Sequence, residues 1–172
     1  MTRERPKFSA ICFDCDGTLT RIEGIDELAR RSGQEDAIAP LTAAAMEGSL
    51  SLEEVYAKRL AVVRPDRDAL AWLGQRYVEG IVDGAVETTA TLQRLGKSVY
   101  LVSGGLLQPV ITLAKAPALT PSNVCAVEIY LDSDGNYVGF DADSALARSD
   151  VKAEAAAALQ RVMASARWSE TE

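Results

Sequence analysis

Residues 8–18 read FSAICFDCDGT, a short apolar run that is followed at once by two aspartates and a glycine. The apolar part, residues 8–13, has the pattern of a strand buried on both faces of a parallel sheet. Asp14 and Asp16 then fall in a loop at the carboxyl end of that strand. Ligands of open α/β sheets bind at this end of the strands, so we expect the two carboxyl groups to converge on one site.

The rest of the chain predicts helices and strands in alternation. Between residues 24 and 77, short helical segments separated by Gly and Pro predict a helical insert, and Ser51 with Glu54 three residues later forms a capping-box signature. Further on, the patterns predict a helix over 86–96, a strand over 97–105, a helix over 107–116, a hairpin from 124–132 and 136–141, and an alanine-rich helix from 151. This order predicts an α/β fold with a parallel sheet of only two or three core strands.

Composition and charge exclude several classes of partner. The 172 residues have a net charge of −7, which disfavours nucleic acid and anionic membranes as partners because both require clustered cations. No apolar run approaches the roughly 18 residues of a membrane span, and the N-terminus lacks the apolar stretch of a secretory signal, so we expect a cytoplasmic location. The three cysteines form no disulfide framework. Cys12 and Cys15 form a C-x-x-C that straddles the end of a strand, and we do not expect a redox role for it.

Two neighbouring carboxylates suit the hydrolysis of a phosphate ester. One can attack phosphorus and form an aspartyl-phosphate, while the other protonates the leaving oxygen and later activates water. Positive charge and N–H donors must then offset the repulsion between the carboxylates and the phosphate. Ser103 and Gly104, at the end of the second strand, and Lys152, at the start of the last helix, can supply such donors. Taken singly, an acidic turn, an ordinary strand-to-helix turn and a surface lysine are the alternative interpretations.

These stretches together resemble a known superfamily. ICFDCDGTLT, LVSGG and a lysine that opens a helix resemble the first three motifs of haloacid dehalogenase (HAD)-type phosphatases. Residues 21–33 (RIEGIDELARRSG), 44–60 (AAMEGSLSLEEVYAKRL) and 136–141 (NYVGFD) resemble the phosphoserine phosphatases within it. The resemblance implies a HAD-like Rossmannoid core of residues 1–22 and 80–172, with an inserted helical cap of residues 23–79. It also implies Mg²⁺-dependent hydrolysis of O-phospho-L-serine, the last step of serine biosynthesis.

The resemblance assigns a role to each candidate residue. Asp14 would be the nucleophile and a Mg²⁺ ligand, and Asp16 would be the general acid/base and bind the metal through its backbone carbonyl. The phosphoryl group would be bound by Ser103 and Gly104, with Lys152 completing the charge balance. In the cap, the substrate ammonium would meet Glu23, its carboxylate would meet Arg59, and Met46 would line the same pocket. For Glu23 and Arg59, a solvated helix face is the alternative.

The sequence departs from the family pattern in two places. Leu52 stands where the family usually has an aromatic residue over the substrate, which implies a looser pocket. The family also continues into a strand and a GDGxxD motif, and neither follows the last helix here, so we expect the sheet to lack its C-terminal strands. Residues 8–13 would then form an apolar sheet edge that favours a homodimer, and we expect an unstable, oligomeric or poorly active product. The alternatives are a HAD phosphatase for another small phosphomonoester and a phospho-ligand-binding fragment without catalysis.

Overall fold

The computed structural model describes residues 8–148 of the chain. The α-helices and strands are β1 (Ala10–Phe13), α1 (Gly24–Ser32), α2 (Glu35–Met46), α3 (Leu52–Val63), α4 (Arg67–Glu79), α5 (Ala85–Arg94), β2 (Ser98–Leu106), α6 (Leu107–Ala114), β3 (Val124–Val127), β4 (Ile129–Leu131) and β5 (Tyr137–Phe140). This order confirms the expected α/β class with a parallel sheet. The helix expected from residue 151 lies outside the described residues.

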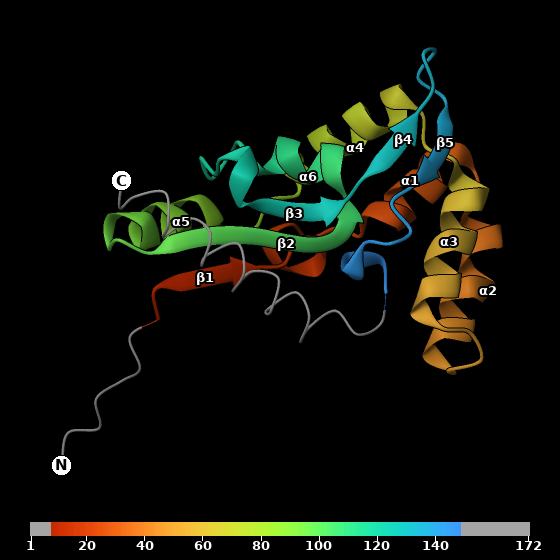
Figure 1. The fold of residues 1–172 in the computed structure, drawn as a ribbon, viewed down its shortest axis with the longest axis horizontal. Coiled ribbons are helices and arrows are strands. Elements are labelled where there is room, and N and C mark those ends of the chain that lie inside the picture. The colour runs from red at the N-terminus through yellow and green to blue at the C-terminus, as the bar shows by residue number, and fades with distance from the viewer. Residues whose placement is uncertain (1–7, 149–172) are drawn as a thin grey trace.

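Three parallel strands in the order β1-β2-β3 form the larger of the two sheets within residues 8–148. Ile11 on β1 lies opposite Val99 on β2, and Val102 on β2 lies opposite Cys125 on β3. The connections from β1 to β2 and from β2 to β3 both step to the next strand in the same direction across the sheet. Because such connections are right-handed, α5 and α6 lie on the same face of the sheet. Figure 1 shows both helices on that side, with α4 packed against α6. All three parallel strands therefore end at the same edge of the sheet.

Two strand predictions need correction. Residues 8–13 are not buried on both faces, because Phe8 is 67% exposed, Cys12 is exposed and the other residues of β1 are only half-buried. Residues 124–132 do not form one hairpin strand, because the run divides at Glu128 into β3, which joins the parallel sheet, and β4, which pairs antiparallel with β5. The hairpin predicted around residues 133–135 is present between β4 and β5.

The chain segments that lead into and out of the helical insert lie side by side. Thr20 and Ile81 form an antiparallel bridge. Beside it the Arg21 N–H donates to the Gly80 carbonyl at 2.9 Å. The insert between these connections contains α1 to α4, and the capping box predicted at Ser51 is present at the start of α3. The entry and the exit of the insert therefore lie side by side, and the boundaries between core and cap stay a prediction.

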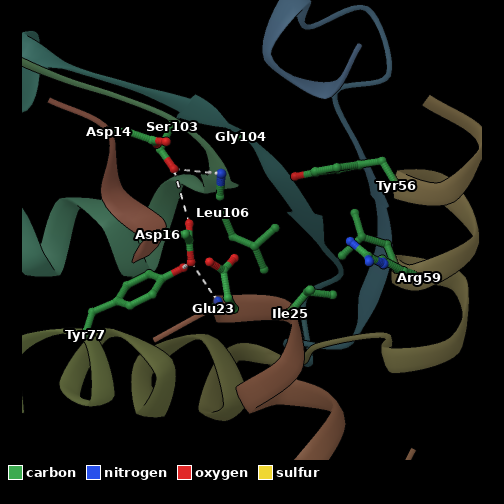
Figure 2. Close-up of a pocket in the computed structure, with 13 residues that line it drawn as sticks. Asp14, Asp16, Glu23, Ile25, Tyr56, Arg59, Tyr77, Ser103, Gly104 and Leu106 are labelled. Atoms are coloured by element: carbon green, nitrogen blue, oxygen red, sulfur yellow. Dashed lines mark hydrogen bonds between the residues drawn. The ribbon is translucent and has the colours of Figure 1, made fainter. Parts of the chain in front are cut away.

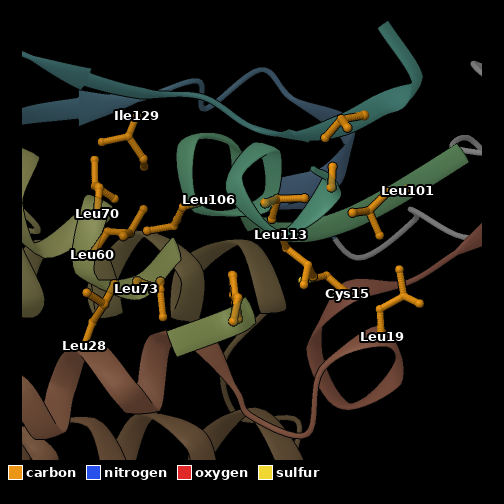
Figure 3. Close-up of a cluster of buried hydrophobic side chains, with 14 of the residues drawn as sticks. Cys15, Leu19, Leu28, Leu60, Leu70, Leu73, Leu101, Leu106, Leu113 and Ile129 are labelled. Carbon is orange, nitrogen blue, oxygen red and sulfur yellow. The ribbon is translucent and has the colours of Figure 1, made fainter. Parts of the chain in front are cut away.

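One apolar core joins the insert to the sheet (Figure 3). Leu28 of α1, Leu60 of α3 and Leu73 of α4 are each at most 1% exposed, as are Leu101 of β2 and Leu113 of α6. Burial of such side chains stabilises the fold by roughly 1.5–3 kcal/mol each, so the insert is held firmly against the strand ends. None of the helices within residues 8–148 is long and apolar enough to cross a membrane.

Candidate active site

A cavity of about 230 Å³ lies where the carboxyl ends of β1 and β2 face the helical insert (Figure 2). Among its lining residues are Asp14 and Asp16 after β1, Glu23 and Gly24 at the start of α1, Tyr56 and Arg59 on α3, Tyr77 on α4, and Ser103 and Gly104 near the end of β2. Six of the eight residues predicted for the site therefore share one cavity. Their catalytic and binding roles stay predictions.

The loop after β1 presents the two aspartates differently. Asp14 is exposed to the cavity and accepts a hydrogen bond from the Cys15 N–H at 2.7 Å. Gly17 follows with a φ of 64°, a left-handed conformation that favours glycine. A Cβ at Gly17 would also lie 3.2 Å from Oε1 of Glu23. The glycine thus lets the loop curl so that Asp14 and Asp16 face the same space.

Three groups hold the Asp16 carboxyl. Its Oδ1 accepts hydrogen bonds from the Gly24 N–H at 2.7 Å and from the Tyr77 hydroxyl at 2.8 Å. Its Oδ2 lies 3.4 Å from the Ser103 hydroxyl. Burial nevertheless raises the pKa of Asp16 above its ordinary value, and the charge of Asp14 adds to this effect. Asp16 is therefore a fixed carboxyl that keeps a proton more readily than an exposed one, which suits a general acid.

The second strand contributes a hydroxyl and glycines through an irregular end. The register between β2 and β3 shifts between Val102 and Leu106, and bulges of this kind often adjoin functional sites. Ser103 is only 2% exposed and accepts a hydrogen bond from the Gly105 N–H at 2.8 Å. A Cβ at Gly105 would lie 2.9 Å from Oδ2 of Asp16. Glycine is therefore required here so that the strand can approach the aspartate loop.

The insert brings charges of both signs to the cavity. The pKa of Glu23 is raised, mainly by desolvation and then by the nearby carboxylates of Asp16, Asp26 and Asp14, while Arg59 opposes the shift. Arg59 on α3 donates from Nη2 to the Thr42 hydroxyl of α2 at 2.5 Å. The cavity can therefore receive a ligand that has both a cationic and an anionic group.

Two predicted site residues are not located. Met46 is the last residue of α2, but its side chain is outside the described part of the chain. Lys152 also lies outside the described residues. The same holds for the side chain of Leu52 at the start of α3, so the expected loosening of the pocket stays a prediction.

Two tyrosines that line the cavity were not predicted from the sequence. Tyr77 is fully buried and reaches Asp16 from a helix 61 residues further along the chain. Tyr56 extends from α3 toward the cavity, and its ring packs on Phe140 of β5 with centroids 5.4 Å apart. Both residues are part of ordinary helical patterns, so only the packing of distant elements reveals them.

The C-x-x-C pair lacks the environment of a redox motif. Cys12 is exposed on β1, whereas Cys15 is fully buried below the aspartate loop. Burial and the neighbouring carboxylates raise the pKa of the Cys15 thiol, which disfavours the reactive thiolate.

The oxygen atoms near Asp14 suit a hard cation only in part. Carboxylate and carbonyl oxygens are the ligands that Mg²⁺ prefers. Within residues 8–148, however, no group of three or more His, Cys, Asp or Glu side chains is arranged to hold a metal ion. Within the described residues, the Asp14 carboxylate is exposed to the cavity and could serve as one ligand of a magnesium ion, so the metal itself stays a proposal.

Comparisons with known proteins show which proteins this chain is similar to. A family model for haloacid dehalogenase-like hydrolases matches residues 8–134. The phosphoserine phosphatase of Rattus norvegicus is 36% identical over 143 residues, which are 83% of this chain and 64% of that protein. A solved structure of a substrate-bound phosphoserine phosphatase complex has a TM-score of 0.72 at 25% identity, covering 93% of this chain and 74% of the other. A phospho-aspartyl intermediate analogue of phosphoserine phosphatase has a TM-score of 0.59 at 31% identity, covering 77% and 61%. The chain thus spans less than two thirds of the rat protein's length.

Proposed function

Because the chain belongs to the haloacid dehalogenase-like hydrolase family, we propose that it hydrolyses O-phospho-L-serine to L-serine and phosphate. The relatives named phosphoserine phosphatase support this substrate. The observation that favours it most is the composition of one cavity, in which two aspartates and a serine face an acidic and a basic side chain. A phosphorylated amino acid needs all of these groups, since it has a phosphate, an ammonium and a carboxylate.

In the proposed reaction, the Asp14 carboxylate attacks phosphorus and the bond from phosphorus to the serine oxygen breaks. Asp16 gives its proton to that oxygen, so L-serine leaves as the neutral alcohol. The deprotonated Asp16 then takes a proton from a water molecule, which attacks the aspartyl-phosphate. This step releases phosphate, frees Asp14 and returns the proton to Asp16. The raised pKa of Asp16 and its fixed position support both of its roles.

Binding groups surround this reaction centre. The Ser103 hydroxyl and the Gly104 N–H would bind phosphoryl oxygens, and Lys152 would balance their charge. Glu23 would receive the substrate ammonium, Arg59 its carboxylate, and Met46 would line the pocket between them. Mg²⁺, held by the Asp14 carboxylate and the Asp16 backbone carbonyl, would supply positive charge where the phosphate meets two carboxyl groups.

The remaining assignments rest on the arrangement of the chain. The chain enters and leaves the helical insert side by side, at the bridge between Thr20 and Ile81. This arrangement supports a core of residues 1–22 and 80–172 with a cap of residues 23–79. A homodimer through β1 is a prediction from the edge position of this strand in the described sheet. A cytoplasmic location also stays a prediction.

The test is Mg²⁺-dependent release of phosphate from O-phospho-L-serine, measured beside an Asp14→Asn variant. Turnover that is present in the parent protein and absent in Asp14→Asn is the expected result. Equal rates in the two proteins would contradict the assignment of Asp14. A folded parent protein that binds the substrate without turnover would identify a phospho-ligand-binding protein instead.

A further inference from the structure

Two donors on α3 lack partners although they are buried at the cavity. Within residues 8–148, neither the Tyr56 hydroxyl nor the Nε of Arg59 has a hydrogen-bond partner. The two residues are three positions apart on one helix, so their side chains lie on the same face. Both line the cavity. A buried polar group without a partner destabilises the protein, so this arrangement calls for an acceptor that is supplied by a ligand.

Neighbouring elements hold both side chains in place. The Thr42 hydroxyl of α2 accepts from Nη2 of Arg59 and fixes the guanidinium. Phe140 of β5 packs against the ring of Tyr56, with the two ring planes at 54°. Figure 2 shows the Tyr56 hydroxyl directed from α3 into the cavity and Arg59 below it on the same helix. The two donors are therefore oriented before any ligand arrives.

The charges around the cavity indicate which ligand group these donors bind. Asp14, Asp16 and Glu23 lie on the wall opposite α3 and repel an anion. A carboxylate therefore finds its favourable place beside Arg59, where its two oxygens can accept from two donors. Burial and the charge of Asp16 raise the pKa of the Tyr56 hydroxyl, so it stays protonated and can donate.

We propose that Tyr56 binds the carboxylate of the substrate together with Arg59: the Tyr56 hydroxyl and the Nε–H of Arg59 each donate to one carboxylate oxygen. This inference rests on the proposed function, because it assigns a further residue of the same site. It makes Tyr56 a determinant of specificity for phosphorylated amino acids over phosphorylated amines.

The experiment compares two ligands in the Asp14→Asn background, in which turnover is prevented, with Mg²⁺ present. O-phospho-L-serine has the carboxylate, whereas O-phosphoethanolamine has the same phosphate and ammonium without it. Calorimetry gives the dissociation constants with Tyr56 intact and with Tyr56→Phe, which keeps the ring against Phe140. We expect Tyr56→Phe to weaken the binding of O-phospho-L-serine about 10-fold and that of O-phosphoethanolamine less than about twofold.

Tyr130→Phe, at a 44%-exposed position on β4, is the matched control and should change neither constant. Unchanged thermal midpoints show that each variant is folded. Equal weakening of both ligands, or no weakening of either, would overturn the role of Tyr56. A parent that binds the two ligands equally would overturn it as well, because the carboxylate is then not recognised. Selective binding in a protein whose unsubstituted form has no phosphatase activity would support Tyr56 and overturn only the proposed function.

Discussion

The hydroxyl of Tyr77 offers the sharpest single test of how the loop of Asp14 and Asp16 is held in place. Tyr77→Phe removes one oxygen from a fully buried side chain and leaves the ring in place. The lost hydrogen bond, 2.8 Å long, is one of two short bonds to Oδ1 of Asp16, and the other comes from the Gly24 N–H at 2.7 Å. Removing one partner of a buried polar group costs about 1–3 kcal/mol, and the Gly24 bond remains.

We therefore expect Tyr77→Phe to lower the free energy of unfolding by about 1–2 kcal/mol in urea titrations. Because Asp16 is the proposed general acid and base, and proton transfer depends on its placement, we also expect kcat for O-phospho-L-serine to fall about 10-fold, which corresponds to about 1.4 kcal/mol in the barrier. KM should change little, because Tyr77 holds Asp16 and is not expected to touch the amino-acid part of the substrate.

Tyr100→Phe is the matched control for this substitution. Tyr100 is buried on β2, 8% exposed, and does not belong to the cavity lining. Its substitution should change kcat by less than about twofold. A Tyr77→Phe variant with lowered stability and unchanged kcat would refute the positioning of Asp16 by Tyr77, and a variant with both quantities unchanged would refute the hydrogen bond as a stabilising interaction.

Three further predictions concern helix α3, helix packing and the metal. Ser51→Ala should lower the free energy of unfolding by about 1 kcal/mol in urea, since it removes the capping box with Glu54. Hydrogen bonds from Ser51 lower the pKa of Glu54 below its ordinary value of 4.5. The stabilisation by these bonds is therefore present above pH 4.5 and is lost as the pH falls through the lower pKa of the folded state. A Ser51→Ala variant whose stability depends on acid pH in the same way as that of the parent would contradict this. Gly74→Ala places a Cβ 2.8 Å from Cβ of Thr112. The cost of overpacking, about 1–3 kcal/mol, should outweigh the gain in helix propensity of roughly 1 kcal/mol, so we expect a lower urea midpoint. A raised urea midpoint would show that α4 and α6 separate easily. Chelation of divalent cations should abolish phosphate release and added Mg²⁺ should restore it, and activity that survives chelation would argue against a metal in this reaction.

Much of the fold follows from local patterns in the sequence. The apolar run before Asp14 predicts a strand, and Gly, Pro and the capping residues mark the helices of the insert at nearly their observed bounds. The turn at residues 133–135 predicts the hairpin. Each of these features depends on neighbouring residues alone, through backbone conformation, capping and hydrophobic periodicity, so a reader of the sequence can recognise it.

Other features depend on contacts between distant residues, and only the tertiary structure decides them. The β-favouring run of residues 124–132 divides at Glu128, because its first half pairs with β2 and its second half pairs with β5. No local pattern in the sequence marks this division. Tyr77 reaches Asp16 across 61 positions, and Tyr56 is oriented by Phe140 from the hairpin. The sequence by itself determined which residues can perform the chemistry, because the aspartate loop is local. The packing of α3, α4 and the hairpin decided which side chains hold the aspartates and face the ligand, because such contacts depend on how separate elements meet in space.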